Sequence, residues 1–154
     1  MRFSMKTEYG VRAIFELAAH HGGEALQSAE IAQRERIPGP FLDQVLMTLR
    51  RAGLIRSMRG PRGGHVLSRS PGEIRLDEVI SCLEGAGPEP DCLSHGEPYG
   101  CILHRVAEKA DHAAREVFAA YTLEELLRTR TSPPEVYHGI FKPIPRRTRR
   151  PARV

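Results

Sequence analysis

Two side chains with metal-binding and proton-transfer chemistry lie one helical turn apart, at Cys101 and His104. At the start of a helix, the i, i+3 spacing lets both point to one side. The helix N-terminus favours the thiolate form of Cys101, and thiolate with imidazole is a known ligand set for [2Fe–2S] clusters. Cys92 precedes them in a loop that could fold over the pair. These residues indicate a metal site, a Cys92–Cys101 redox switch, or a nucleophile and base.

The chain contains three cysteines, an odd number that does not suggest a disulfide scaffold. We therefore expect free thiols or metal ligands in a reducing compartment. Cys82 lies beside the inward face of the helix expected over 76–84, which favours a small core residue.

A second group of residues has the chemistry to bind a polyanion. Residues 50–62 contain no acidic residue but carry Arg50, Arg51, Arg56, Arg59 and Arg62. Arg59 and Arg62 bracket a Gly/Pro-rich turn that includes Gly63, where the backbone can come close to a partner and an arginine can enter a narrow minor groove. This pattern predicts DNA contact, with a solvated surface charge as the alternative for each single arginine.

The helix expected between Pro40 and Gly53 has one apolar face, formed by Leu42, Val45, Leu46 and Leu49 at i, i+3, i+4 and i+7. Facing outward or flanking it are Phe41, Asp43, Gln44, Met47, Thr48 and Arg51. Gln44 could pair with adenine, and Asp43 could accept a hydrogen bond from cytosine. Asp43 has an equally good alternative as a first-turn carboxylate stabilised by the helix dipole.

The elements around this helix follow from periodicity. An apolar face predicts a helix from Met5 to His20, and we expect Ser28 to cap a second, short helix. Residues 54–59 and 65–68 read as two strands joined by the glycine-rich turn. Three helices followed by a β-hairpin are typical of a winged helix-turn-helix. The fold class is mainly α with a small β-hairpin wing and a long dimerisation helix.

The second half has a different organisation. We expect a helix over 76–84, with Leu76, Val79, Ile80 and Leu83 inward, and a Gly/Pro-rich loop over 85–100. The helix from Cys101 to Ala120 carries a heptad seam that suits a second helix, either of another copy or of its own domain. Thr122 and Glu125 form a capping box. The expected divisions are a DNA-binding domain (1–75), an effector loop with dimerisation helices (76–130) and a disordered basic tail (131–154).

Charge divides the chain in the same way. The net charge is +4; basic residues predominate over 1–75 and 142–154, and acidic residues over 76–141. A basic first half suits binding to a polyanion, and an acidic second half suits self-association or a small effector. The alternative is that these charges only form a solvated surface. No apolar run is long enough to span a bilayer and no signal core opens the chain, so we expect a cytoplasmic protein without a membrane partner.

Several of these segments together resemble the Rrf-two (Rrf2) family of bacterial winged-helix transcriptional regulators, which includes regulators of the IscR and NsrR type. The matches are the opening 1–13, the segments 41–46 and 49–54, the wing Arg59-Gly60-Pro61-Arg62-Gly63-Gly64-His65-Val66-Leu67, and the segments 77–80 and 122–126. The resemblance implies a homodimer on a roughly palindromic double-stranded operator, with a long helix that crosses between the subunits. It also implies that position 43 and Arg59 read the operator.

The resemblance extends to the sensing loop, with one departure. Family members that sense iron, redox state or nitric oxide carry three cysteines there; Cys92 resembles the first and Cys101 the third, but the middle one is absent. In some relatives a carboxylate at the place of Glu8, from the partner subunit, completes the cluster. The implied ligands are Cys92, Cys101, His104 and Glu8, with His95 as a substitute. Alternatively, Glu8 pairs with Arg12, His104 is a polar helix residue and His95 a loop residue.

The expected function is a homodimeric, sequence-specific DNA-binding repressor, with a [2Fe–2S] cluster that senses redox state, iron or nitric oxide as one expectation for its signal. The expected DNA-binding residues are Ser28, Phe41, Asp43, Gln44, Thr48, Arg50, Arg51, Arg59, Arg62 and Gly63. A metal-free regulator that senses a metabolite, thiol oxidation or a partner enzyme is the alternative. An enzyme with Cys101 as nucleophile and His104 as base lacks a third, orienting group, so we expect no enzyme.

Overall fold

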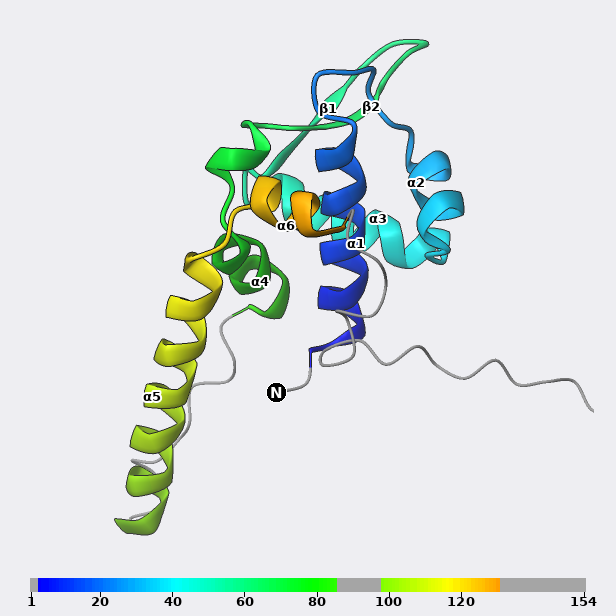
Figure 1. Ribbon diagram of the computed structural model, residues 1–154. Helices are drawn as coiled ribbons and strands as arrows, with labels where there is room; N and C mark the ends of the chain where they lie inside the picture. The colour runs from blue at the N-terminus through cyan, green and yellow to red at the C-terminus, as the bar shows by residue number, and fades with distance from the viewer. Residues whose placement is uncertain (1–2, 86–97, 131–154) are drawn as a thin grey trace, which may run out of the picture.

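The computed structural model describes residues 3–85 and 98–130, with side chains except at 98–101, 103 and 130. The elements run in the order α1 (Met5–Ala19), α2 (Ser28–Glu35), α3 (Gly39–Arg51), β1 (Ile55–Met58), β2 (Gly64–Leu67), a 3-10 turn (Pro71–Glu73), α4 (Leu76–Glu84), α5 (Pro98–Ala119) and α6 (Leu123–Arg130). Figure 1 shows a body of helices with the β1–β2 hairpin projecting from one end and α5 extending from the other. The mainly helical class with a hairpin wing is confirmed.

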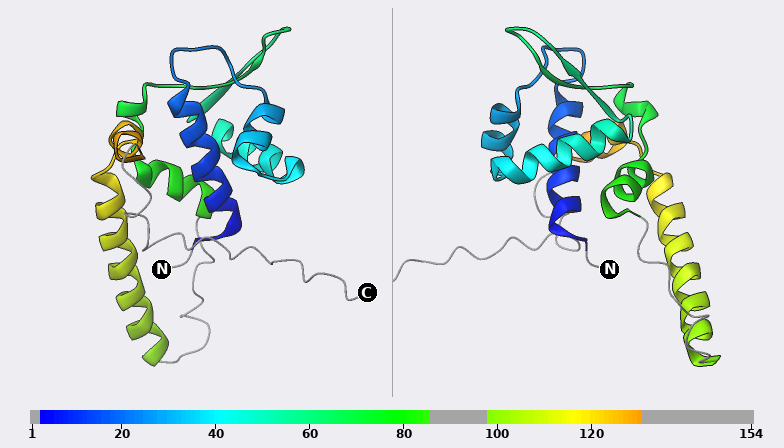
Figure 2. Two further views of the ribbon diagram at one scale, coloured as in Figure 1. Left: turned by 45° about the vertical axis from the view of Figure 1, so that its right-hand side comes forward. Right: turned by 180° about the vertical axis from the view of Figure 1, so that it is seen from behind.

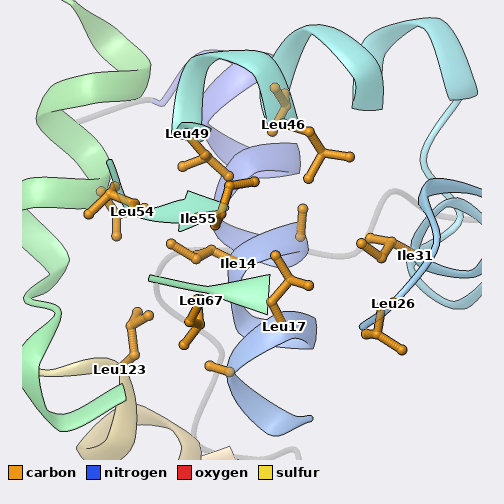
Figure 3. Packing of buried hydrophobic residues seen from close by; sticks show 14 of the residues in the cluster. Ile14, Leu17, Leu26, Ile31, Leu46, Leu49, Leu54, Ile55, Leu67 and Leu123 are labelled. Atoms are coloured by element: carbon orange, nitrogen blue, oxygen red, sulfur yellow. The ribbon is translucent and has the colours of Figure 1, made fainter. Parts of the chain in front are cut away.

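The core lies where α1 crosses α3 and the base of the hairpin. Ile14, Leu42, Leu49 and Ile55 are at most 2% exposed, and Figure 3 shows Leu and Ile side chains from the helices and both strands converging. The predicted apolar face of α3 is buried in full. Burial of each such side chain stabilises the fold by roughly 1.5–3 kcal/mol.

The wing is a two-stranded antiparallel sheet, with Ile55 opposite Leu67 and Ser57 opposite His65. It is anchored on its other edge by Leu26, which exchanges two backbone hydrogen bonds with His65, at 2.8 and 3.1 Å. β1 is one residue shorter at each end than the predicted 54–59, and β2 is shifted by one residue toward the turn from the predicted 65–68. The glycine-rich turn begins at Arg59, because Gly60 takes a φ of 113°, which ends the extended backbone.

The last helix returns to the body. Leu123 of α6 is fully buried in the common core, and its N–H donates to Ile74 O while Leu76 N–H donates to Tyr121 O. The predicted capping box is confirmed, since Thr122 N–H donates to Glu125 at 2.8 Å and Glu125 N–H donates to Thr122 Oγ1 at 3.3 Å. The C-terminal end of α5 is therefore fixed to the body, and both views in Figure 2 show its other end standing away from it.

Two expectations for α4 and α2 need correction. In α4 only Val79 and Leu83 are buried, while Leu76 and Ile80 are partly exposed. In α2 the cap position is Gln27, not Ser28, and Gln27 N–H donates to Glu30 Oε2 at 2.9 Å. The helix thus begins with Ser28, which leaves its hydroxyl available for a tertiary contact. The loop and the tail that we expected over 85–100 and 131–154 lie mostly or wholly outside the described residues.

One carboxylate in the body is buried. Glu16 of α1 is 7% exposed and accepts a hydrogen bond from Arg34 of α2 at 2.9 Å. This ion pair ties α1 to α2, and solvent screens it on the side of Arg34, whose side chain is 44% exposed. Within the described residues, no helix is both long and apolar enough to cross a membrane.

Candidate nucleic-acid interface

The outer face of α3 combines polar and apolar side chains. Asp43 and Gln44 are exposed near the N-terminal end of the helix, and beside them Phe41 is 51% and Met47 40% exposed. Carboxylate and amide groups can hydrogen-bond to base edges, and apolar side chains can contact thymine methyl groups. The buried face of α3 holds this outer face in place.

Phe41 is not a free side chain. Its ring packs edge-on against Tyr9 of α1, with 6.0 Å between ring centroids, and the guanidinium of Arg12 lies 6.0 Å from the centre of the Tyr9 ring. Arg12 in turn pairs with Glu35 of α2 at 3.2 Å. The expected alternative, a pair of Arg12 with Glu8, is wrong, because Glu35 takes that arginine. This chain of contacts fixes the start of α3 against α1 and α2.

Two other expected DNA-binding residues use their hydroxyl groups inside the protein. Thr48 is partly buried and donates to Gln44 O of the preceding turn at 3.0 Å. Ser28 Oγ lies 3.1 Å from Nε2 of His65 in the wing. Both remain candidates, since a hydroxyl oxygen can accept and donate at once.

The wing tip presents two arginines. Arg59 and Arg62 are exposed on either side of Gly60 and Pro61, and Arg62 forms an exposed ion pair with Glu24 at 3.2 Å. Gly63 cannot carry a side chain here, because a Cβ would lie 2.8 Å from Gly60 O and closer still to Met58 O. Within the described part of the chain, Arg50, Arg51, Arg56 and Arg59 form no ion pair.

A groove of about 730 Å³ separates the wing from the loop between α1 and α2. Its walls include Glu24 and Met58, and its basic residues are Arg56, Arg59 and Arg62. The unpaired arginines give this side of the molecule a positive field that attracts a phosphate backbone.

Sequence reasoning passed over His65. Its ring lies between Ser28 and Ser57, with Nδ1 3.4 Å from Ser57 Oγ. Burial lowers the pKa of His65 below 6.5, Arg50 lowers it further, and Asp43 opposes them. The signal in the sequence was a histidine at an inward-facing position of a strand, in register with a serine.

The residues expected to hold a cluster are only partly described. Cys92 and His95 lie outside the described residues, and Cys101 lies in the first turn of α5. His104 Nε2 pairs with Glu108 at 3.1 Å, and Glu8 is partly buried in α1. No three His, Cys, Asp or Glu side chains gather as metal ligands within residues 3–85 and the described part of 98–130.

Cys82 has no metal-binding role in this arrangement. It packs against the core from α4, and its thiol donates to Val79 O at 3.2 Å. Burial raises the pKa of Cys82 to about 11, so the thiol stays protonated at neutral pH. This agrees with the expectation of a core residue.

Comparisons of sequence identify similar proteins. Residues 3–129 match the model of a family described as Rrf2, iron-dependent transcriptional regulator. The HTH-type transcriptional regulator CymR of Bacillus subtilis is 33% identical over 137 residues, which cover 89% of this chain and 97% of CymR. A protein of Synechocystis sp. named as an HTH-type transcriptional regulator is 39% identical over 84 residues, which span 54% of this chain and just 57% of that protein.

Solved structures of similar fold carry related names. The structure of T. potens IscR superposes with a TM-score of 0.68 at 33% identity, over 84% of this chain and 88% of that one. The structure of CymR (YrzC) of B. subtilis, described as its global cysteine regulator, also gives 0.68 at 33% identity, over 83% of this chain and 97% of that one. The described winged helix and the long helix thus have solved counterparts.

Proposed function

Because this chain belongs to the Rrf2 family of transcriptional regulators, we propose that it is a homodimeric repressor that binds a palindromic DNA operator. The proposal assigns α3 to the major groove and the wing to the adjacent minor groove. The observation that carries it is the pairing of a buried apolar face on α3 with an outer face of Asp43, Gln44 and unpaired arginines.

Each proposed DNA-binding residue has a role that its chemistry supports. Asp43 accepts from a cytosine amino group, Gln44 pairs with adenine, and Phe41 contacts a thymine methyl group. Arg59 enters the minor groove at the wing. The backbone at Gly63 comes close enough to contact a phosphate. The remaining phosphate contacts come from the side chains of Ser28, Thr48, Arg50, Arg51 and Arg62.

In this proposal the chain keeps three functional divisions. Residues 1–75 bind DNA, residues 76–130 carry the signal and the dimer contact, and residues 131–154 form a basic tail that adds salt-sensitive, nonspecific affinity. The named relatives are transcriptional regulators, so we assign no catalytic role to Cys101 and His104.

DNA binding is tested by selection from a library of randomised duplexes, followed by gel-shift titration of the winning sequence. We expect a palindrome whose half-sites are separated by about one helical turn of DNA. We also expect its affinity to exceed that of a scrambled duplex by at least about a thousandfold. Failure to enrich any sequence, with the protein folded by circular dichroism, would refute sequence-specific binding.

The homodimer rests on the outer face of α5. Val106 is 59% and Val117 58% exposed in the single chain, and both belong to the predicted heptad seam. A neighbouring face of α5, which includes Ala114 and Phe118, lies beside α4. An apolar seam of heptad spacing suits a second helix of the same kind, and a two-fold dimer matches a palindromic site.

For the signal, we propose the segment that contains Cys92, Cys101 and His104. The family description as iron-dependent favours a [2Fe–2S] cluster, with Glu8 of the partner subunit as the fourth ligand. When bound, a cluster would supply redox and nitric-oxide chemistry. The chain's own residues would shift the relative tilt of the two α3 helices and so change operator affinity.

The alternative is a metal-free sensor that responds to a metabolite, a partner enzyme or oxidation of Cys92 and Cys101. The His104–Glu108 pair favours it, because that imidazole already has a partner. Anaerobic purification with iron and sulfide analysis separates the two. Near-stoichiometric iron and sulfide, lost in Cys101→Ala, support the cluster; an iron-free protein that binds DNA supports the alternative.

A further inference from the structure

His65 stands where four parts of the DNA-binding half meet. Its ring nitrogens face Ser28 at the start of α2 and Ser57 of β1. Its backbone N–H and C=O are both bonded to Leu26. Because the backbone is held on one side and the ring on two others, the ring has a fixed position relative to α2 and the wing.

The recognition helix α3 acts on the same ring through charge. Arg50 disfavours the protonated form and Asp43 favours it, while burial disfavours it most. Two further elements, α2 and β1, present the uncharged hydroxyls of Ser28 and Ser57 to the ring. The end of α1 and the loop after it bring His20, His21 and Glu24 to a small cavity that His65 also lines. With these opposing influences the pKa of His65 lies below 6.5, so the free protein holds a neutral ring at pH 7.

A neutral imidazole carries one N–H and one lone pair. One serine must then accept a hydrogen bond from the ring, while the other must donate its own hydrogen to it. A protonated ring donates at both nitrogens, so both serine oxygens accept and both hydroxyl hydrogens turn to other acceptors. Phosphate oxygens beside α2 and the wing would be such acceptors, and their negative charge favours the protonated ring.

We propose that His65 is a positioning residue which fixes the wing against α2, and that operator binding is coupled to uptake of one proton by its ring. This inference rests on the proposed DNA-binding function. By linkage, a proton taken up on binding makes affinity rise as pH falls, by at most about tenfold per pH unit.

The experiment compares the wild-type chain with His65→Asn on the selected duplex between about pH 6 and pH 8. The wild type should bind about three- to tenfold more tightly at the lower pH. His65→Asn, whose amide cannot titrate there, should lose most of that dependence and bind about fivefold more weakly at the lower pH. The matched control, His112→Asn on exposed α5, should behave as the wild type.

A wild-type affinity independent of pH, or an unchanged slope in His65→Asn, would overturn the coupling. Thermal melting checks that His65→Asn is folded; if it is not, Ser57→Ala removes a single ring partner and should reduce the slope instead.

A second measurement needs no DNA. In the free chain, the NMR chemical shifts of the Ser28 and Arg50 amides should change with pH, with the same midpoint as the His65 ring. Amide shifts that do not follow the titration of His65 would refute the positioning role. If the wild type selects no duplex while this coupling is present, the proposed function fails and the positioning role does not.

Discussion

Leu83 of α4 occupies the space that a methyl group on Gly10 of α1 would fill. A Cβ at Gly10 would lie in steric overlap with both terminal methyls of Leu83 and 3.0 Å from its Cγ. Leu83 is 1% exposed, so its side chain is packed inside the core. The close approach of α1 and α4 therefore requires glycine at position 10.

We predict that Gly10→Ala destabilises the protein. Overpacking costs about 1–3 kcal/mol, partly offset by about 1 kcal/mol of helix propensity. Urea unfolding should show a lower midpoint. Gly39→Ala, where a Cβ meets nothing within 4 Å, is the control. Adding Leu83→Ala to Gly10→Ala should be less harmful than the two single effects summed, and strict additivity would argue against the steric explanation.

Arg59→Ala should lower affinity for the selected operator at least about tenfold, because the side chain is exposed at the wing tip and has no ion-pair partner among the described residues. The slope of the logarithm of the binding constant against the logarithm of the salt concentration should decrease in magnitude by about one, because one phosphate contact is lost. Gel-shift titration at several salt concentrations measures both. The control is Arg115→Ala, which removes one positive charge from α5. If both variants lost operator affinity equally, the effect would be due to net charge and not to a contact at the wing.

Val117→Glu should convert the dimer into monomers, since it places a charge in the apolar seam of α5. Sedimentation equilibrium gives the mass, and operator affinity should drop by more than about tenfold when two half-sites are no longer joined. Arg115→Glu, on the side of α5 that faces α4, should leave the mass unchanged. A Val117→Glu chain that still sediments as a dimer would remove the seam from the proposal.

Cys82 should resist alkylation. Burial raises the pKa of its thiol from 9.0 to about 11, so its thiolate fraction near pH 8 is about a hundredfold below that of an exposed thiol. Iodoacetamide labelling of the Cys92→Ser/Cys101→Ser variant follows Cys82 alone. Labelling should become fast in urea, and fast labelling of the native protein would contradict the burial of this side chain.

Glu84→Gln should make the stability of the protein depend less steeply on pH in the acidic range. The hydroxyl of Thr7 and the N–H of Ser4 hold the pKa of Glu84 below 4.5. A lowered carboxyl pKa contributes stability above the unfolded value and loses it as the pH falls through the folded one. The exposed position limits the effect to less than about 1 kcal/mol. Thermal melts from about pH 6 to about pH 3 measure it, with Glu116→Gln as the control; parallel wild-type and Glu84→Gln curves would contradict it.

The pattern of apolar residues and glycines in the sequence was sufficient to predict α3 and the wing. The i, i+3, i+4, i+7 rule predicted the buried face of α3 residue by residue, because Leu42, Val45, Leu46 and Leu49 meet one continuous core. The wing followed from its glycines, whose conformations few other residues adopt. In these segments the local preference and the tertiary contacts agree.

Local rules failed where a distant residue competed for the same group. Ser28 was expected to cap α2, but its hydroxyl meets His65, 37 residues later. Arg12 has Glu8 at i−4, yet it pairs with Glu35, 23 residues later. Such contacts depend on how helices and the wing pack in three dimensions, which neither spacing nor propensity encodes.

Leu123 connects α6, at the end of the described chain, to the core formed by the earlier elements. It is fully buried in the core, and α6 packs against α1 and the 3-10 turn, although it follows the long α5 helix. A fragment of residues 1–75 alone would lack Leu123, and the loss of one such buried leucine side chain costs about 2–5 kcal/mol by itself. Unfolding at the junction of α5 and α6 would withdraw Leu123 from the core in the same way, so the stability of this junction and that of the core are coupled.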